Sequence, residues 1–120
     1  MAAELSEYTV AGHLEKSDPI VRKIYSNLLT ALRKFGPVHE AAKKTCIHLD
    51  NKSGFAGVFL RKNYINLNIR TDYKITSPRA QKTEQVSKSR YHQTIKLAFE
   101  ADIDKELLGW LKDAYNLNVK

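Results

Sequence analysis

Apolar side chains recur every four residues between positions 20 and 32, which is the spacing of an amphipathic helix. Asp18 is the expected N-cap, and Pro19 suits the first helical position, where a missing N–H costs nothing. Gly36 and Pro37 favour an end to the helix. The apolar stripe consists of Ile20, Ile24, Leu28 and Leu32, widened by Val21, Tyr25, Leu29 and Phe35.

Residues 45–70 change to an alternation of apolar and polar positions, which is the period of a strand with one buried face. In the last part of this region, Asn66, Asn68 and Arg70 alternate with three aliphatic residues. We therefore expect an antiparallel meander that presents one polar face. Its predicted strands are residues 45–49, 55–61 and 64–70, joined by turns at 50–54 and 62–63.

A further strand at residues 90–99 and a second helix complete the predicted fold. The polar face of this strand collects Arg90, His92, Thr94 and Lys96. Asp102 is the expected cap of the helix, whose apolar stripe is Ile103, Leu107, Trp110, Leu111 and Ala114. This order of elements predicts an α+β fold. An antiparallel sheet of four strands, or five, carries an N-terminal and a C-terminal helix on one face.

The length of 120 residues fits a single domain, which we place at residues 17–120. Residues 1–16 are expected to form an arm that lies against the domain or frays. No apolar run is long enough to span a membrane, and the N-terminus lacks the pattern of a secretion signal. The single cysteine, Cys46, cannot form an internal disulfide. We therefore expect a cytoplasmic protein without a membrane partner.

The net charge of +7 is concentrated in the middle of the chain. Residues 41–96 hold twelve bases and three acids, whereas residues 1–40 hold five of each. Residues 97–120 hold five acids and three bases. A segregated positive charge of this kind can attract phosphate or another acidic partner. The alternative is a solvated surface that only keeps the protein soluble.

Residues 77–94, SPRAQKTEQVSKSRYHQT, contain part of this basic excess. The segment is polar and reads as a long connector, although Arg90 and His92 already belong to the last predicted strand. A structureless connection of about 16 residues is uncommon in a compact domain, and such loops are usually functional or disordered. Loop length alone leaves both possibilities open.

No set of residues stands out as catalytic. The cluster Asp102, Asp104 and Glu106 falls at a predicted helix N-terminus, where carboxylates complement the helix dipole. Asp50-Asn51-Lys52 has the shape of a nuclease metal motif, but these residue types are also expected in a turn. Cys46 and His48 share a strand face, yet nothing in the sequence orients the histidine. We therefore predict no catalytic residue, no metal and no cofactor. This favours a protein that is not an enzyme.

The polar sheet face is a better candidate for function. If the predicted strands pair, this face collects polar side chains from two of them, and several cations at one end of the sheet would bind phosphate or carboxylate groups. The side chains are Asn66, Asn68 and Arg70 from one strand and Arg90, His92, Thr94 and Lys96 from the other. Tyr64 and Tyr91 are candidates for stacking on bases, or for the core. Further cations lie at neighbouring strand ends: Lys43, Lys44, Arg61 and Lys62.

Several stretches of the sequence resemble one uncharacterised bacterial domain. They are 43–49 (KKTCIHL), 55–58 (FAGV), 61–64 (RKNY), 77–79 (SPR) and 84–87 (EQVS), together with 102–108 (DIDKELL), 110–112 (WLK) and 114–115 (AY). Lys82, Arg90 and His92 belong to the same pattern. The family is of the "domain of unknown function" class, and its members are often labelled predicted transport proteins. The similarity spans residues 8–118.

The resemblance implies a small α+β domain of the YjbR/MmcQ-like type, an antiparallel sheet flanked by helices. It implies no established activity, and the transport label does not fit a chain without a membrane segment. Most of the motif residues are basic or carry an amide, and we take them as candidates for anion binding. They are Lys44, Arg61, Lys62, Arg79, Lys82, Gln85, Arg90 and His92.

The sequence thus predicts a bacterial binding module without catalysis, whose partner is nucleic acid or a phosphate-bearing ligand. The first alternative is a small nuclease-like or other hydrolytic enzyme that uses His92 with Asp50 or Glu84. The second is a protein-interaction or dimerisation module, for example a homodimer, which would show an exposed sheet edge.

Overall fold

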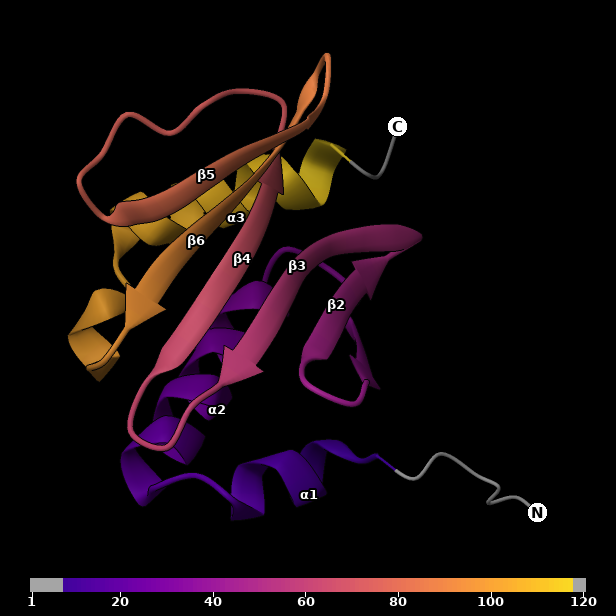
Figure 1. Ribbon diagram of the computed structural model, residues 1–120. Helices are drawn as coiled ribbons and strands as arrows, with labels where there is room; N and C mark the ends of the chain where they lie inside the picture. Colours follow the sequence, from indigo (N-terminus) through magenta and orange to yellow (C-terminus); the bar gives the residue numbers. More distant parts are fainter. Residues whose placement is uncertain (1–7, 118–120) are drawn as a thin grey trace.

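Antiparallel strands form one sheet, and two helices cover one of its faces (Figure 1). The computed structural model describes residues 8–117. Within them the strands are β1 (His39–Ala42), β2 (Ile47–Asn51), β3 (Ser53–Leu60), β4 (Ile65–Thr71), β5 (Ala80–Ser87) and β6 (Arg90–Leu97). The helices are α1 (Val10–Glu15), α2 (Pro19–Leu32) and α3 (Lys105–Leu117), with a 3-10 turn η1 (Glu100–Asp102). The spatial order of the strands is β1-β2-β3-β4-β6-β5.

The predicted first helix is confirmed as α2. Asp18 has extended backbone angles, and its carbonyl accepts a hydrogen bond from the N–H of Val21 at 3.0 Å. The helix ends at Leu32, one turn before Gly36, whose φ of 149° turns the chain towards β1. A side chain at Gly36 would also collide with the hydroxyl of Tyr115. Glycine at this position is therefore required on two counts.

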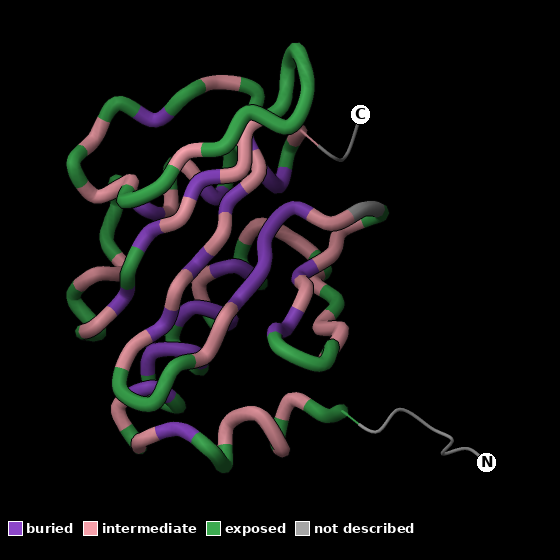
Figure 2. The backbone as a smooth tube through the Cα atoms, viewed as in Figure 1, coloured by how far each residue is buried: buried purple, intermediate pink, exposed green. Residues whose placement is uncertain are grey.

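The predicted separation of an apolar and a polar sheet face is confirmed in β4. Its side chains alternate strictly between buried and half-buried, which Figure 2 shows as alternating colours along the strand. The buried set faces α2 and α3, which lie behind the sheet in Figure 1. The opposite face, with Asn66, Asn68 and Arg70, is not covered by α2 or α3. We call it the open face. The core comprises Ile65, Leu67 and Ile69 with Val58, Ile95, Leu97, Leu28, Leu32, Leu107 and Leu111 among others.

The predicted strand count was too low, because both edge strands were missed. The segment expected to be a long connector contains β5, which pairs with β6 so that Thr83 faces Gln93 and Glu84 faces His92. Most β5 side chains are exposed, so the strand carries no apolar alternation and is held by its backbone hydrogen bonds. At the other edge, β1 has only four residues. The described sheet has six strands.

The predicted cap of the second helix was also wrong. Asp104 caps α3, because its carboxylate accepts a hydrogen bond from the N–H of Leu107 at 3.0 Å. Asp102 instead accepts from the N–H groups of Ala98 and Phe99, at 2.8 and 3.0 Å, and so stabilises η1. Both aspartates lie at the start of the same apolar stripe, and the sequence pattern does not separate them.

Residues 8–16 of the predicted arm include α1, and residues 1–7 lie outside the described part. Val10 and Leu14 pack against the core, and the ring nitrogen Nε2 of His13 hydrogen-bonds the carbonyl of Lys43 at 2.6 Å. This contact joins α1 to the turn between β1 and β2. None of the helices within residues 8–117 has the length and apolar character needed to cross a bilayer.

A buried glutamine attaches the β4–β5 loop to the inner side of the sheet. Gln93 is fully buried, and its Oε1 accepts from the N–H of Ile75 at 2.6 Å. Its Nε2 donates to the carbonyl of Tyr73 at 3.0 Å and to the hydroxyl of Thr71. The amide of Gln93 and the polar groups of the loop thus form hydrogen bonds with each other inside the protein. An unpaired polar group buried there would be costly.

Replacing Gln93 by Leu should lower the free energy of unfolding by ~2–3 kcal/mol, because buried N–H and C=O groups of the loop lose their partners. Urea denaturation followed by circular dichroism measures this change. Gln81→Leu, at an exposed position of β5, is the control and should stay within ~0.5 kcal/mol of the wild type. Equal stability of the two variants would contradict the role of the buried amide.

Candidate anion-binding site

Two arginines and a histidine line a pocket of about 230 Å³ at one end of the sheet. Arg70 is the second-last residue of β4, while Arg90 and His92 belong to the start of β6. Gly54, Val86, Ser87 and Leu117 complete the lining. We call this the cationic pocket.

Strand pairing brings these side chains together. Arg70 and His92 are direct partners in the β4–β6 register, so both point to the open face. Arg90 follows the turn at the end of the β5–β6 hairpin, where the register shifts between Gln85 and Ser87. Such a bulge bends and twists a strand locally. The end of the hairpin thereby lines the cationic pocket with Val86 and Ser87, while β3 contributes Gly54.

A glycine makes room for the guanidinium of Arg70. Its Nη1 donates a hydrogen bond to the carbonyl of Gly54 at 3.1 Å. A Cβ atom at position 54 would lie 2.8 Å from this nitrogen, which is too close. The small residue at the start of β3 therefore leaves room for the guanidinium in this position.

The surroundings of His92 favour its neutral form in the free protein. Burial lowers the pKa of its imidazole, the neighbouring Arg70 lowers it further, and Glu84 on β5 acts in the opposite direction. Bringing an anion into the pocket would offset the charge of Arg70 and favour the imidazolium. The site can therefore gain a positive charge when an anion arrives.

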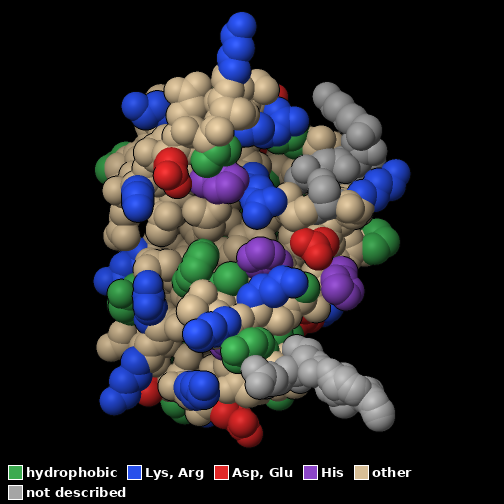
Figure 3. Space-filling view, turned by 45° about the vertical axis from the view of Figure 1, so that its right-hand side comes forward, with side chains coloured by type: hydrophobic (Ala, Val, Ile, Leu, Met, Phe, Trp, Pro, Cys, Tyr) green, Lys and Arg blue, Asp and Glu red, His purple; other side chains and the backbone are tan. Residues whose placement is uncertain are grey.

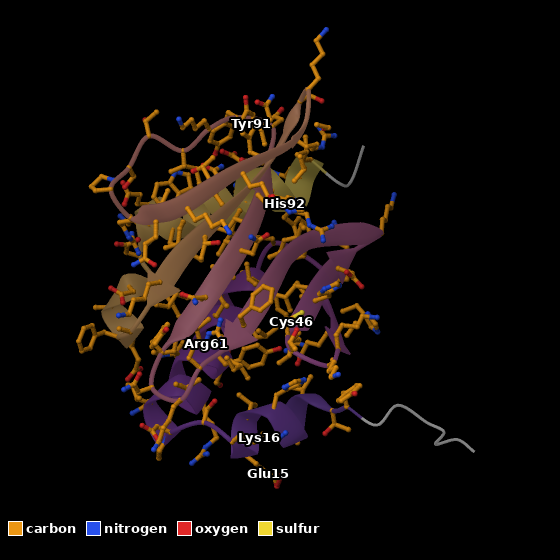
Figure 4. All side chains as sticks on the ribbon, viewed as in Figure 1. Glu15, Lys16, Cys46, Arg61, Tyr91 and His92 are labelled. Carbon is orange, nitrogen blue, oxygen red and sulfur yellow. The ribbon has the colours of Figure 1, made fainter. Side chains whose placement is uncertain are left out.

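The other predicted residues do not join this pocket. Lys44 lies in the β1–β2 turn and lines a separate hollow beside α1. Arg61 and Lys62 lie in the β3–β4 turn, at the end of the sheet opposite His92 (Figure 4). Their carbonyls accept hydrogen bonds from Ser17 at 2.9 Å and from the N–H of Asp18 at 2.8 Å. This turn thus also positions the start of α2.

Two candidates lie on β5. Lys82 is exposed and pairs with Thr94, on the open face. Gln85 pairs with Tyr91, and its amide lies 3.5 Å from the carbonyl of Lys88. Both lie on the same hairpin as Arg90 and His92, but neither lines the cationic pocket.

Arg79 is held by contacts within the protein. Its guanidinium donates to the carboxylates of Asp104 at 2.9 Å and Glu106 at 3.0 Å, and to the carbonyl of Asp102 at 2.7 Å. It also lies 5.7 Å from the ring centre of Trp110. These contacts join the loop before β5 to the start of α3.

The charges in this cluster stabilise one another. Burial lowers the pKa of Arg79, but hydrogen bonds to Asp104 and Glu106 outweigh it and raise the pKa overall. The pKa of Asp104 is lowered, first by the N–H of Leu107 and then by Arg79. Arg79 is thus engaged in structural ion pairs.

The acidic and nucleophilic residues have structural surroundings. Asp104 and Asp102 serve as caps, and burial raises the pKa of the Cys46 thiol, which keeps it protonated at neutral pH. Within residues 8–117 no three His, Cys, Asp or Glu side chains are placed to share a metal ion. Figure 3 shows Lys, Arg and His side chains spread over the face in view, with a few Asp and Glu side chains among them.

Arg70 was missing from the candidates taken from the family motif. The alternation in β4 already assigned it to the polar face, which was the available signal. Only the strand register shows that it lies beside His92.

A family model described as "Domain of unknown function (DUF5655)" matches residues 10–118. This match confirms the predicted class of domain and covers most of the chain. Comparison with curated proteins and with solved structures gave no match.

Replacing Arg79 by Ala should lower the free energy of unfolding by ~1–3 kcal/mol, because two carboxylates and a carbonyl lose a charged donor. Arg90→Ala removes an exposed arginine and should cost no more than ~0.5 kcal/mol. Urea denaturation compares the two variants. The imidazole NMR signals of His92 should keep their positions in Arg79→Ala, and a large shift would show that Arg79 also shapes the cationic pocket.

Proposed function

The chain belongs to a family of domains of unknown function, DUF5655, and we propose that it is a non-catalytic binding module for an anionic partner. The observation that supports this function is the convergence of Arg70, Arg90 and His92 on one pocket. The site combines two permanent positive charges with a histidine that can become charged.

Each side chain has a separate part in binding. Arg70 uses one N–H on Gly54 and has further N–H groups for phosphate or carboxylate oxygens. Arg90 is exposed on the hairpin and hydrogen-bonds the carbonyl of Ser89 at 2.9 Å, so it can turn towards a ligand at little cost. His92 pairs with Arg70, lies two residues after Arg90 on β6, and adjusts its charge to the ligand.

Nucleic acid is the anionic partner that we favour over a small phosphate ligand. The open face continues from the pocket with hydrogen-bonding side chains, Asn68 and Thr94, and with the cations Lys82 and Lys96. A phosphate chain can follow such a surface, whereas a small ligand would use the pocket alone. Affinity for nucleic acid falls steeply with salt because bound counterions are released.

The hydrolytic alternative rests on the pair of His92 and Glu84, which face each other across β5 and β6. A carboxylate beside an imidazole can raise its basicity. Turnover of a phosphodiester that disappears in His92→Ala would favour this alternative over simple binding.

Two further expectations rest on the sequence. A cytoplasmic location agrees with the single cysteine, and kinship with the YjbR/MmcQ-like fold agrees with an antiparallel sheet flanked by helices.

A second candidate function is self-association through β5. This strand ends the sheet, and within the described residues no other strand pairs with its outer edge. Its sequence is self-complementary: antiparallel pairing of two copies about Thr83 places Lys82 opposite Glu84 twice, and Gln81 opposite Gln85. Lys82 and Glu84 lie on the same face, as opposite charges across such a pair require.

The variant Arg70→Gln with Arg90→Gln should bind inorganic phosphate and single-stranded oligonucleotides at least ~10-fold more weakly than the wild type, because two charge-assisted contacts are lost. NMR titration of His92 measures binding directly. In the wild type, phosphate should raise the lowered pKa of His92, since a nearby anion stabilises the imidazolium.

The matched control removes two exposed charges from the helical side, Lys34→Gln with Lys112→Gln. It has the same net charge as the pocket variant and should bind nearly as well as the wild type at moderate salt. Equal weakening in both variants would mean that net charge, and not the cationic pocket, is responsible. No response of His92 to phosphate in the wild type would contradict the proposed site.

For the edge strand, sedimentation equilibrium of the wild type should show a dimer that weakens in Lys82→Glu, because two carboxylates then face each other in both halves of the pair. Adding Glu84→Lys to this variant restores opposite charges and should restore the dimer. A wild type that stays monomeric, or a dimer unaffected by Lys82→Glu, would rule out pairing through β5.

A further inference from the structure

Phe99 is the most exposed of the large apolar side chains in the described part of the chain, with 67% of its surface accessible. It lies two residues after the last residue of β6, at the end of the sheet away from the cationic pocket. Together with Tyr64 and Asn63 it lines a second pocket of about 410 Å³. Ile20, Lys96 and Ala98 complete this lining, and we call it the aromatic pocket.

The aromatic pocket contains a positively charged side chain, Lys96. The ammonium of Lys96 lies 4.6 Å from the ring centre of Tyr64, which is a cation–π contact. Lys96 pairs with Asn66 across β4 and β6, so its side chain lies on the open face, as His92 does. The aromatic pocket and the cationic pocket therefore lie at the two ends of the same pair of strands.

The surface between the two pockets is polar and carries no carboxylate from either strand. Asn66 and Asn68 of β4 lie beside Thr94 of β6, and all three can hydrogen-bond to a ligand. From Tyr64 to Arg70 the separation along β4 is ~20 Å, at the usual rise per residue of a strand. A ligand that reaches both pockets must therefore be long, anionic and able to stack.

We propose that a single-stranded nucleic acid lies along β4 and β6, with a phosphate in the cationic pocket and a base stacked on Phe99 in the aromatic pocket. The proposal rests on the anion-binding function inferred above and extends it to a second subsite. The distance between the two pockets corresponds to about four nucleotides, which is within the range of site sizes of known single-strand binding modules. The strand must be unpaired, because a base inside a duplex cannot stack on a side chain.

The chemistry of the aromatic pocket fits a base and its phosphate. The ring of Phe99 provides a stacking surface, and the amide of Asn63 provides a donor and an acceptor for a base edge. Lys96 lies where the flanking phosphate would pass. A protein partner would require a wider apolar patch, whereas the neighbouring open face presents Asn66, Asn68 and Lys96.

The test compares two labelled strands of about eight nucleotides, oligothymidylate and an abasic strand of equal length. Phe99→Ala should bind oligothymidylate ~10-fold more weakly than the wild type, because one stacked base is lost. Its affinity for the abasic strand should not change. Tyr8→Ala, which removes another exposed aromatic ring remote from β6, is the control and should bind both strands as the wild type does.

Phe99→Trp keeps a stacking surface and adds a fluorescent reporter. It should retain the affinity of the wild type, and its added emission should be quenched by oligothymidylate but not by the abasic strand. Phe99 is exposed, so neither substitution disturbs the core, and circular dichroism verifies the fold.

Failure of this subsite differs from failure of the anion site. Oligothymidylate affinity that is unchanged in Phe99→Ala, with a normal response of His92 to phosphate, would overturn the aromatic subsite alone. An equal loss towards both strands would overturn stacking as the role of Phe99. Absence of any response of His92 to phosphate or to either strand would overturn the anion site itself.

Discussion

The burial of only one face of the sheet is the constraint on which the rest of this structure depends. The helices α2 and α3 cover the aliphatic side of β3, β4 and β6, and the other side is left to solvent. Because strand side chains alternate, each residue placed in the core also places its neighbours on the open face. The polar surface considered for binding is therefore a direct consequence of core packing.

Basic residues in this chain serve two different purposes, although they look alike in the sequence. Arg79 is bound to Asp104 and Glu106 and stabilises the start of α3. Within residues 8–117 the guanidinium of Arg70 hydrogen-bonds the backbone carbonyl of Gly54 and pairs with no carboxylate, and it lines a pocket. Positive charge alone is thus a weak guide to binding, because a guanidinium satisfied by carboxylates has little left to offer a ligand.

The elements with a strong apolar pattern were predictable, and those without one were not. The stripe of α2 and the alternation of β4 follow from burial, so hydrophobicity reports them. β5 has exposed side chains on both faces and is recognisable only from its pairing with β6. Likewise, both Asp102 and Asp104 fit a cap, and the choice depends on which backbone N–H groups each carboxylate reaches.

For the candidate site, the alternation along each strand was enough to assign Arg70, His92 and Lys96 to the polar face, because side-chain direction follows from the two-residue period. It did not determine which cations meet. That was decided by the β4–β6 register, which places Arg70 opposite His92, and by the turn that leaves Arg61 and Lys62 at the other end. Register depends on pairing between distant segments, which only the tertiary structure specifies.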